Sequence, residues 1–218
     1  MKKIFLGFSF LSLISASAFS QDVKFGIQAG TAIASQKAKA SGISISSDGK
    51  VGFTVGAIAD ISLAENITFQ PALNFTQKGS KFNISEGSES MESTQTLNYL
   101  ELPFNFLYHA PAGNGKFFAG LGPVVNYGIS GKAKVKMSGE AETSEDINFG
   151  TDEEQDDYKP FEFAGNVLAG YEFSNGLFVA ANYNAGLSNI AVGGDSDNSL
   201  KNRYFGVRVG FKFGAPKK

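Results

Sequence analysis

The sequence predicts an all-β fold, an eight-stranded antiparallel up-and-down transmembrane β-barrel, from three observations. Eight stretches alternate apolar residues with polar residues or glycine, as strands do when their two faces meet different surroundings. Long and short connections take turns between these stretches. The aromatic residues of the apolar face gather toward the two ends of the strands, and aliphatic residues fill the middle.

The alternation defines each predicted strand in turn. The strands cover residues 23–33, 51–61, 67–76, 98–108, 117–129, 161–173, 177–187 and 203–213. The apolar face carries no charge, and its positions in strand order are Phe25, Ile27, Ala29, Ile33; Val51, Phe53, Val55, Ala57, Ala59, Ile61; Ile67, Phe69, Leu73, Phe75; Leu100, Leu102, Phe104, Phe106, Tyr108; Phe117, Ala119, Leu121, Val125, Tyr127; Phe161, Phe163, Val167, Ala169, Tyr171, Phe173; Leu177, Val179, Ala181, Tyr183, Leu187; Phe205, Val207, Val209, Phe211 and Phe213.

The opposite face of the same strands holds nearly all their charges, amides and glycines. In the last strand, for example, Arg208 lies between Val207 and Val209. Glycines on this face leave room for larger neighbours such as Tyr204, Phe118 and Phe178. An eight-stranded barrel is just wide enough for such side chains to fill.

The connections alternate in length, which predicts one end with tight turns and one end with long loops. The short connections are 62–66, 109–116 and 174–176. The long ones are 34–50, 77–97, 130–160 and 188–202. Outer-membrane barrels have short periplasmic turns and longer external loops. With eight strands, both ends of the barrel domain lie on the short-turn side.

The depth of the aromatic residues indicates which face meets lipid. Phe25, Phe69 and Phe213 are among those at the short-turn end, while Phe53 and Phe205 are among those at the long-loop end. Two aromatic girdles around an aliphatic band are what a bilayer selects. The alternative is a soluble antiparallel barrel with its apolar face inside, where aromatics have no reason to sort by depth.

The beginning of the chain has the pattern of a secretory signal peptide. Lys2 and Lys3 precede an apolar run, and Ala18-Phe19-Ser20 forms a small-x-small cleavage site. We therefore expect residues 1–20 to be a signal peptide and 21–218 to be one outer-membrane barrel domain. The chain has no cysteine, which excludes disulfides and a lipid-modified cysteine, and its net charge of −2 gives no indication of nucleic acid binding.

Three prolines lie inside predicted strands. Pro71, Pro103 and Pro123 lack the N–H that a β-ladder needs, although every barrel strand has two neighbours. We expect these prolines to mark β-bulges, which barrels use for curvature.

Several motifs, in order, resemble the porT-type outer-membrane β-barrel family of Gram-negative envelopes. They are residues 70–79 (QPALNFTQKG), 99–103 (YLELP), 118–123 (FAGLGP) with Tyr127-Gly128, 170–173 (GYEF), 183–190 (YNAGLSNI) and 206–213 (GVRVGFKF). The resemblance implies an outer-membrane barrel with no known shared reaction. One departure is that five residues follow Phe213, where such chains commonly finish at a terminal aromatic residue that the barrel-assembly machinery reads.

Charged residues on the inward face are candidates for buried pairs or for a site. Glu101 and Arg208 both point inward at middle depth, either as a polar gate or, as we favour, as a structural ion pair. We expect Lys24, Asp60, Glu172 and Lys212 to make a similar network near the short-turn end.

The sequence offers little that supports catalysis or metal binding. The single histidine, His109, is predicted to be a solvated or interfacial turn residue, because no nucleophile motif accompanies it. The acidic run within 140–157 lacks the glycine and spacing of an EF-hand, so a solvated charge run is favoured over a calcium site. We therefore predict no catalytic, cofactor-binding or metal-binding residues and no cofactor.

Together these features predict a non-enzymatic integral protein of the cell outer membrane. Its role would be structural or interactive, with a surface partner met through loops 34–50, 77–97, 130–160 and 188–202. Its other expected partners are outer-membrane lipid and, during insertion, the barrel-assembly machinery, and no nucleic acid. A passive conduit for small solutes and an accessory part in protein secretion are the alternatives.

Overall fold

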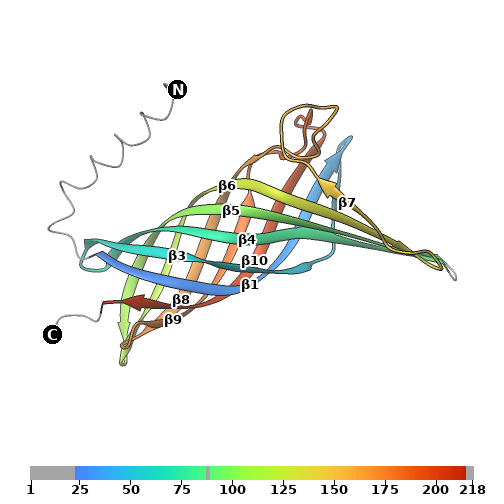
Figure 1. Ribbon diagram of the computed structural model, residues 1–218. Coiled ribbons are helices and arrows are strands. Elements are labelled where there is room, and N and C mark those ends of the chain that lie inside the picture. Colours follow the sequence, from blue (N-terminus) through green and yellow to red (C-terminus); the bar gives the residue numbers. More distant parts are fainter. Residues whose placement is uncertain (1–22, 87–88, 215–218) are drawn as a thin grey trace, which may run out of the picture.

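The computed structural model describes residues 23–86 and 89–214, which form a closed antiparallel barrel (Figure 1). The barrel strands are β1 (Val23–Ala40), β3 (Lys50–Ala64), β4 (Ile67–Glu86), β5 (Glu89–Ala112), β6 (Gly115–Met137), β8 (Phe161–Phe173), β9 (Leu177–Gly186) and β10 (Ser199–Phe213). Each pairs with the next, and β10 pairs with β1 to close the ring. The predicted eight-stranded antiparallel barrel is confirmed.

Two short strands lie outside the ring at the long-loop end. β2 (Ile43–Ser46) pairs with the upper part of β1, and β7 (Thr143–Ile147) pairs with the upper part of β6. No helix within the described residues is long and apolar enough to cross a membrane. The predicted signal peptide, residues 1–20, lies outside the described residues.

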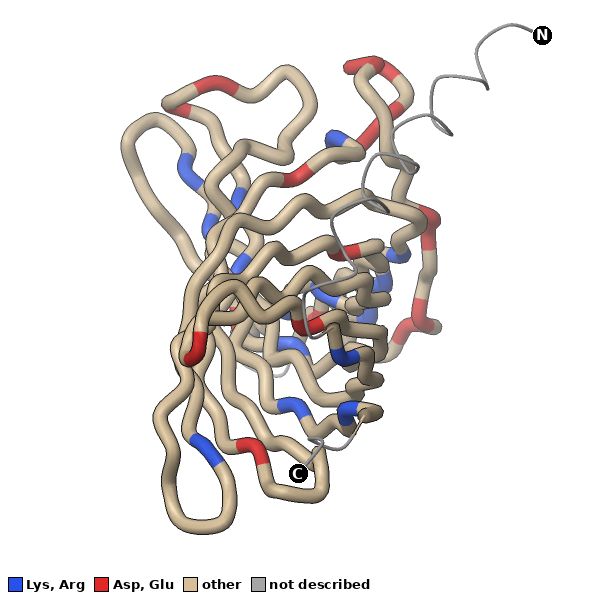
Figure 2. The backbone as a smooth tube through the Cα atoms, turned by 90° about the vertical axis from the view of Figure 1, so that its left-hand side faces the viewer, with Lys and Arg blue, Asp and Glu red and all other residues tan. Residues whose placement is uncertain are grey.

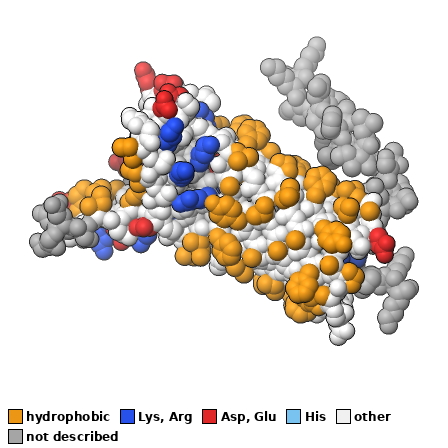
Figure 3. Space-filling view, turned by 180° about the vertical axis from the view of Figure 1, so that it is seen from behind, with side chains coloured by type: hydrophobic (Ala, Val, Ile, Leu, Met, Phe, Trp, Pro, Cys, Tyr) orange, Lys and Arg blue, Asp and Glu red, His pale blue; other side chains and the backbone are white. Residues whose placement is uncertain are grey.

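The two faces of the sheet have the predicted orientation. Val207 is 44% exposed on the outside of the barrel, and its neighbour Arg208 is only 5% exposed inside it. Figure 3 shows the apolar side chains as a band over the outer surface. Because charges are enclosed and apolar side chains face outward, this surface suits hydrocarbon rather than water.

Aromatic pairs across neighbouring strands form the two girdles. At the short-turn end, the ring centroids of Phe69 and Phe106 lie 5.1 Å apart and those of Phe117 and Tyr171 lie 4.9 Å apart. At the long-loop end, Phe53 and Phe75 are separated by 5.6 Å, and Tyr127 and Phe161 by 5.1 Å. Such contacts stabilise a sheet beyond the burial of area.

Six of the eight barrel strands extend beyond the predicted boundaries, while β8 matches its prediction and β9 ends one residue earlier. Residues predicted as the loop 77–97 instead form a long hairpin of β4 and β5, which projects from the barrel in Figure 1. Parts of 34–50 and 130–160 are also strand, as is most of the predicted turn 109–116. Strand β6 continues through Lys132–Lys136, inside the predicted connection 130–160. Backbone pairing continues past the apolar band because polar side chains on neighbouring strands can pair with one another. Lys81 on β4 and Glu92 on β5 do so at 2.7 Å.

The prolines interrupt the ladders without forming bulges, so that prediction was wrong. Next to Pro71, Pro103 and Pro123, the pairing with the preceding strand lapses for two residue pairs and then resumes in the same register. A missing N–H removes a hydrogen bond, but it need not insert a residue. The register shifts lie elsewhere, at Ser62/Ala64 and at Asn98/Tyr99.

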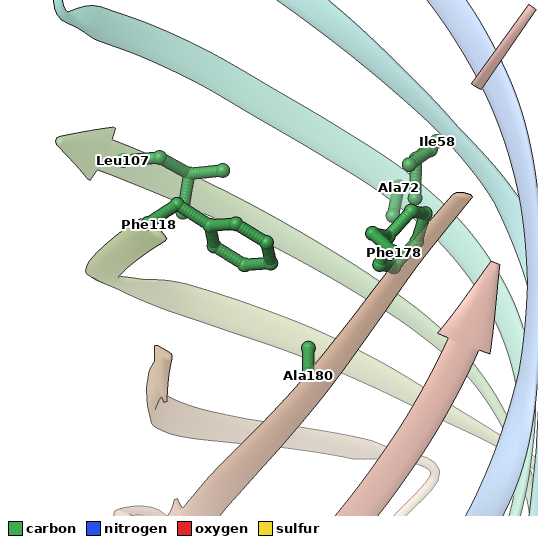
Figure 4. Packing of buried hydrophobic residues seen from close by; sticks show 6 residues of the cluster. All are labelled: Ile58, Ala72, Leu107, Phe118, Phe178 and Ala180. Atoms are coloured by element: carbon green, nitrogen blue, oxygen red, sulfur yellow. The ribbon is translucent and has the colours of Figure 1, made fainter. Parts of the chain in front are cut away.

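The apolar part of the interior lies toward the short-turn end. Phe118 and Phe178 pack there in a T-shaped arrangement, with centroids 6.3 Å apart (Figure 4). Leu107, Ile58, Ala72 and Ala180 complete this cluster. As the sequence predicted, glycines make the space, since a Cβ at Gly170 would lie 2.5 Å from Cζ of Phe118.

Candidate functional site

The middle of the barrel is filled by a buried charge network, which we call the central network. It consists of Lys78, Glu101, Glu162, Tyr204 and Arg208. Arg208 Nη2 lies 3.4 Å from Glu101 Oε1, which confirms the predicted ion pair. The Tyr204 hydroxyl donates to the same carboxylate at 2.8 Å and accepts from Arg208 Nη2 at 2.6 Å.

Lys78 joins the two carboxylates of the network. Its Nζ is 3.6 Å from Glu101 Oε2 and 3.3 Å from Glu162 Oε2. The two cations and two anions therefore balance, which is the condition for burying them. Sequence reasoning missed Lys78, because the predicted third connection began at residue 77. Continued alternation past Thr76 would have placed it inside.

A second charged group, the lower cluster, lies at the short-turn end and comprises Asp60, Lys116, Glu172 and Lys212. Lys212 Nζ is 2.5 Å from Asp60 and 2.7 Å from Glu172, and Lys116 is 3.5 Å from Glu172. Figure 2, which views the barrel from this end, shows acidic and basic residues side by side on the strands. The predicted network is confirmed for Asp60, Glu172 and Lys212. Lys24 lines a cavity of about 320 Å³ next to it.

His109 is inside the barrel, which corrects the prediction of a solvated turn residue. It is 5% exposed, and its ring centroid lies 6.0 Å from that of Phe118. The reason is that β5 pairs with β6 as far as Ala112, so His109 keeps the inward side of the alternation. Neither imidazole nitrogen has a hydrogen-bond partner among the described residues.

The end of β7 and the long loop between β7 and β8 pack against inward side chains at the upper end of the barrel. Ile147 is buried there against Leu97 and Tyr99, and Phe149 contacts Tyr99 edge-to-face with centroids 5.6 Å apart. The Tyr158 hydroxyl donates to Gln95 at 2.7 Å, and burial raises the pKa of Tyr158 above its ordinary value. We call Ile147, Phe149 and Tyr158 the loop plug. Sequence reasoning missed it because three separated apolar residues show no periodicity.

The acidic part of the same loop bonds largely to its own backbone. Asp157 accepts a hydrogen bond from the Asn148 N–H at 2.8 Å, and Asp156 accepts one from the Asp152 N–H at 2.9 Å. Among the described residues, no group of three or more His, Cys, Asp or Glu side chains is placed to hold a metal ion.

Beyond the upper girdle the strands continue as a wall, which we call the crown (residues 36–48, 79–86, 89–97 and 131–147). Its outer face carries ion pairs such as Lys134–Glu142 at 2.6 Å. Its inner face continues the lumen side of the strands and carries exposed apolar side chains instead. These are Ile43 and Ile45 on β2, Phe82 and Ile84 on β4, Met91 on β5 and Met137 on β6.

The inner-face residues form a row because strand register aligns them. Ile84 lies opposite Met91, and Met91 lies opposite Met137. The Asp48–Lys81 bridge brings the segment after β2 against β4. Ile84, at one end of this row, is 64% exposed, Met137 at the other end is 44% exposed, and Met91 between them is 37% exposed.

The family follows from the sequence match, which spans residues 19–192 of the chain and is described as an outer membrane protein beta-barrel domain. The chain belongs to this family. The family, the enclosed charges and the apolar outer surface together identify an integral outer-membrane protein. In such barrels the short turns are periplasmic and the long loops are extracellular.

Among the similar solved structures are outer-membrane barrels of low sequence identity. Ail, the attachment invasion locus protein of Yersinia pestis, is 15% identical with a TM-score of 0.42, covering 88% of this chain and 99% of Ail. Neisserial surface protein A is 15% identical with a TM-score of 0.41 and the same coverage. The outer-membrane protease OmpT from Escherichia coli is 11% identical with a TM-score of 0.37, covering 88% of this chain and 96% of OmpT. No curated protein matches the sequence.

Proposed function

We propose that this chain is a non-conducting, non-enzymatic outer-membrane protein that binds a partner at the cell surface through the inner face of its crown. The observation that carries the proposal is the row Ile84, Met91 and Met137, which is exposed beyond the membrane band. Contiguous exposed apolar surface marks interaction sites on folded proteins. The outer face of the crown is charged and its inner face is apolar, so the crown is amphipathic. This is expected of a sheet that packs against a partner on one face only.

The filled interior supports a closed barrel over a solute conduit. The side chains of Lys78, Glu101 and Glu162 are at most 1% exposed, and the loop plug lies above them. Opening a path would separate buried ion pairs, which is costly because each charge would lose its partner. We expect the purified protein to give no steady conductance in a planar bilayer. Stable single-channel steps from the intact protein would overturn this part of the proposal.

Photo-crosslinking in intact cells tests the binding role. A photoreactive residue at Ile84 faces the inner side of the crown, and one at the adjacent Asn83 faces the outer side. We expect a discrete adduct from position 84 that is lost when Ile45 and Met91 are changed to serine, and none from position 83. Equal adducts from both positions, or none from position 84 with the protein at the surface, would contradict the proposal.

We also propose that residues 1–20 are a signal peptide and that the barrel is of the porT type. The leader pattern and the ordered motifs from Gln70 to Phe213 support these two points. N-terminal sequencing of the mature protein tests the first, with Gln21 expected as the first residue. Loss of surface cargo on deletion of the gene would instead favour an accessory role in secretion.

A further inference from the structure

Four basic side chains gather on the outer surface of β1 and β10, and we call them the basic cluster: Lys37, Lys39, Lys201 and Arg203. All occupy outward positions, because they continue the alternation of the lipid-facing residues Ile33 and Phe205. Figure 3 shows Lys and Arg side chains gathered at the extracellular border of the apolar band. The cluster therefore lies outside both the lumen and the inner face of the crown.

The register fixes the depth of the basic cluster. Ile33 lies opposite Phe205 in the upper girdle, Ser35 opposite Arg203 on the next outward pair, and Lys37 opposite Lys201 on the pair after that. Outward positions recur every two residues, which is about 7 Å along a strand. The surface thus changes from apolar to cationic within one step, at the level where lipid headgroups begin.

The charges of the basic cluster are poorly compensated by the protein. Of these four side chains, only Lys39 has a carboxylate partner among the described residues, Asp197 at 3.3 Å. Asp195, in the same loop, accepts hydrogen bonds from the backbone N–H groups of Asp197 and Asn198. Within the described chain, Lys37, Lys201 and Arg203 form no ion pair.

Three other outward lysines of the crown are paired, whereas Lys136 forms no ion pair within the described residues. Lys81 contacts Glu92 at 2.7 Å, Lys132 contacts Asp146 at 3.4 Å, and Lys134 contacts Glu142 at 2.6 Å. By contrast, Lys37 and Lys201 are two like charges directly opposite each other, an arrangement that destabilises a sheet unless an anion lies between them. The basic cluster thus brings together three outward basic side chains that have no ion-pair partner within the described residues.

Arg203 is also oriented by the fold. Its Nε donates to Ser35 Oγ at 2.9 Å, which holds the guanidinium group against the strand surface while leaving its terminal nitrogens available. Arginine and lysine together are the usual recognition groups for phosphate. Basic residues placed next to a membrane surface also attract anionic lipid.

We propose that the basic cluster binds the phosphate groups of the phosphorylated glycolipid in the outer leaflet around the barrel. The acyl chains of that lipid would lie on the apolar surface directly below, at Ile33, Phe205 and Val207. The site would hold the barrel at a fixed depth and would supply the anions that β1 and β10 lack. It is independent of any partner bound at the inner face of the crown.

The test compares lipid retention by native mass spectrometry of the full chain in detergent. The probes are phosphorylated lipid A and the same lipid with its phosphates removed. The test variant is Lys37→Gln/Lys201→Gln/Arg203→Gln, and the matched control is Lys81→Gln/Lys132→Gln/Lys134→Gln, which removes the same charge from paired positions. Heat-modifiable gel mobility checks that each barrel is folded, and Lys201→Gln alone replaces the triple variant if it fails to fold.

We expect the wild type and the control to bind phosphorylated lipid A at least about tenfold more tightly than the test variant, since charge-assisted hydrogen bonds to phosphate are lost. Removing the phosphates should weaken binding to the wild type by a similar factor. Equal binding by the test variant, or equal binding of the two lipids, would overturn the proposal. Tighter binding of soluble inorganic polyphosphate than of lipid A would instead assign the site to a soluble polyanion and also overturn it.

Discussion

Replacing Glu101 by glutamine keeps the shape of the side chain and removes the carboxylate on which the central network converges. In the described chain, Glu101 is the only acidic residue in contact with Arg208, and it also accepts the Tyr204 hydroxyl at 2.8 Å. Lys78 keeps a second carboxylate, Glu162 at 3.3 Å. The uncompensated charge would therefore fall mainly on Arg208, which is 5% exposed.

The expected effect is large because Glu101 and Arg208 are buried. Removing one partner of a buried ion pair costs about 3–5 kcal/mol, and the remaining pair of Lys78 with Glu162 places this case near the lower figure. The matched control is Glu142→Gln, whose partner Lys134 is 2.6 Å away with both side chains about half exposed. Exposed pairs contribute about 0–1 kcal/mol. The double variant Glu101→Gln/Arg208→Gln should recover at least about 1 kcal/mol of the loss, because it also removes the orphaned charge.

Equilibrium unfolding in guanidinium, with the barrel in lipid vesicles, measures these differences. The chain has no tryptophan, so the transition is followed by far-UV circular dichroism and by gel mobility without boiling. If Glu101→Gln lowers the free energy of unfolding no more than Glu142→Gln does, the interior at this level is hydrated and the reasoning about a filled lumen is refuted.

Three further predictions concern the plug and the interior packing. Phe149→Ala should cost roughly 1–2 kcal/mol, since the ring is half-buried, and should speed subtilisin cleavage within residues 148–158. Unchanged cleavage would mean that the loop plug does not depend on this contact. Gly170→Ala should destabilise the barrel by about 1–3 kcal/mol, because the new methyl group meets Phe118 and the Val179 carbonyl. The control Gly165→Ala should be neutral, since the nearest neighbour of its methyl group is 4.0 Å away. Similar unfolding midpoints for the two variants would contradict this packing. The folded pKa of Tyr158 is raised above its unfolded value near 10, so its contribution to loop docking is lost as pH rises above about 10. Subtilisin cleavage within residues 148–158 should therefore accelerate there in the wild type relative to Tyr158→Phe. Identical pH profiles of the two proteins would argue against a buried hydroxyl.

The sequence predicts the barrel well where the bilayer imposes a strict period. Val207 and Arg208 illustrate this, because only one face of a strand can meet hydrocarbon and a single residue step reverses exposure. Beyond the girdles that constraint ends. The segment around Lys81 and Glu92 is held extended by cross-strand pairing and lacks the apolar alternation. The sequence therefore predicts a loop where the structure has two strands.

The interior could be predicted in part. The position of each residue along its strand was enough to predict that Glu101 lies near Arg208 and Lys212 near Glu172. Lys78 and His109 were missed because each lies just past a strand boundary that was placed too early. The loop plug, including the contact of Phe149 with Tyr99, depends on where a long loop folds back onto the barrel. No local sequence pattern encodes that position.

The orientation of the barrel wall is tested most directly by nitroxide labels at Val207 and Asn182, which lie on adjacent strands at nearly the same depth, outside and inside the barrel respectively. Oxygen dissolves in hydrocarbon, so collisions with oxygen should be frequent at position 207 and rare at position 182 in the protein reconstituted in lipid vesicles. Frequent collisions at position 182 with few at position 207 would mean that the polar face meets the lipid, which contradicts the barrel described above.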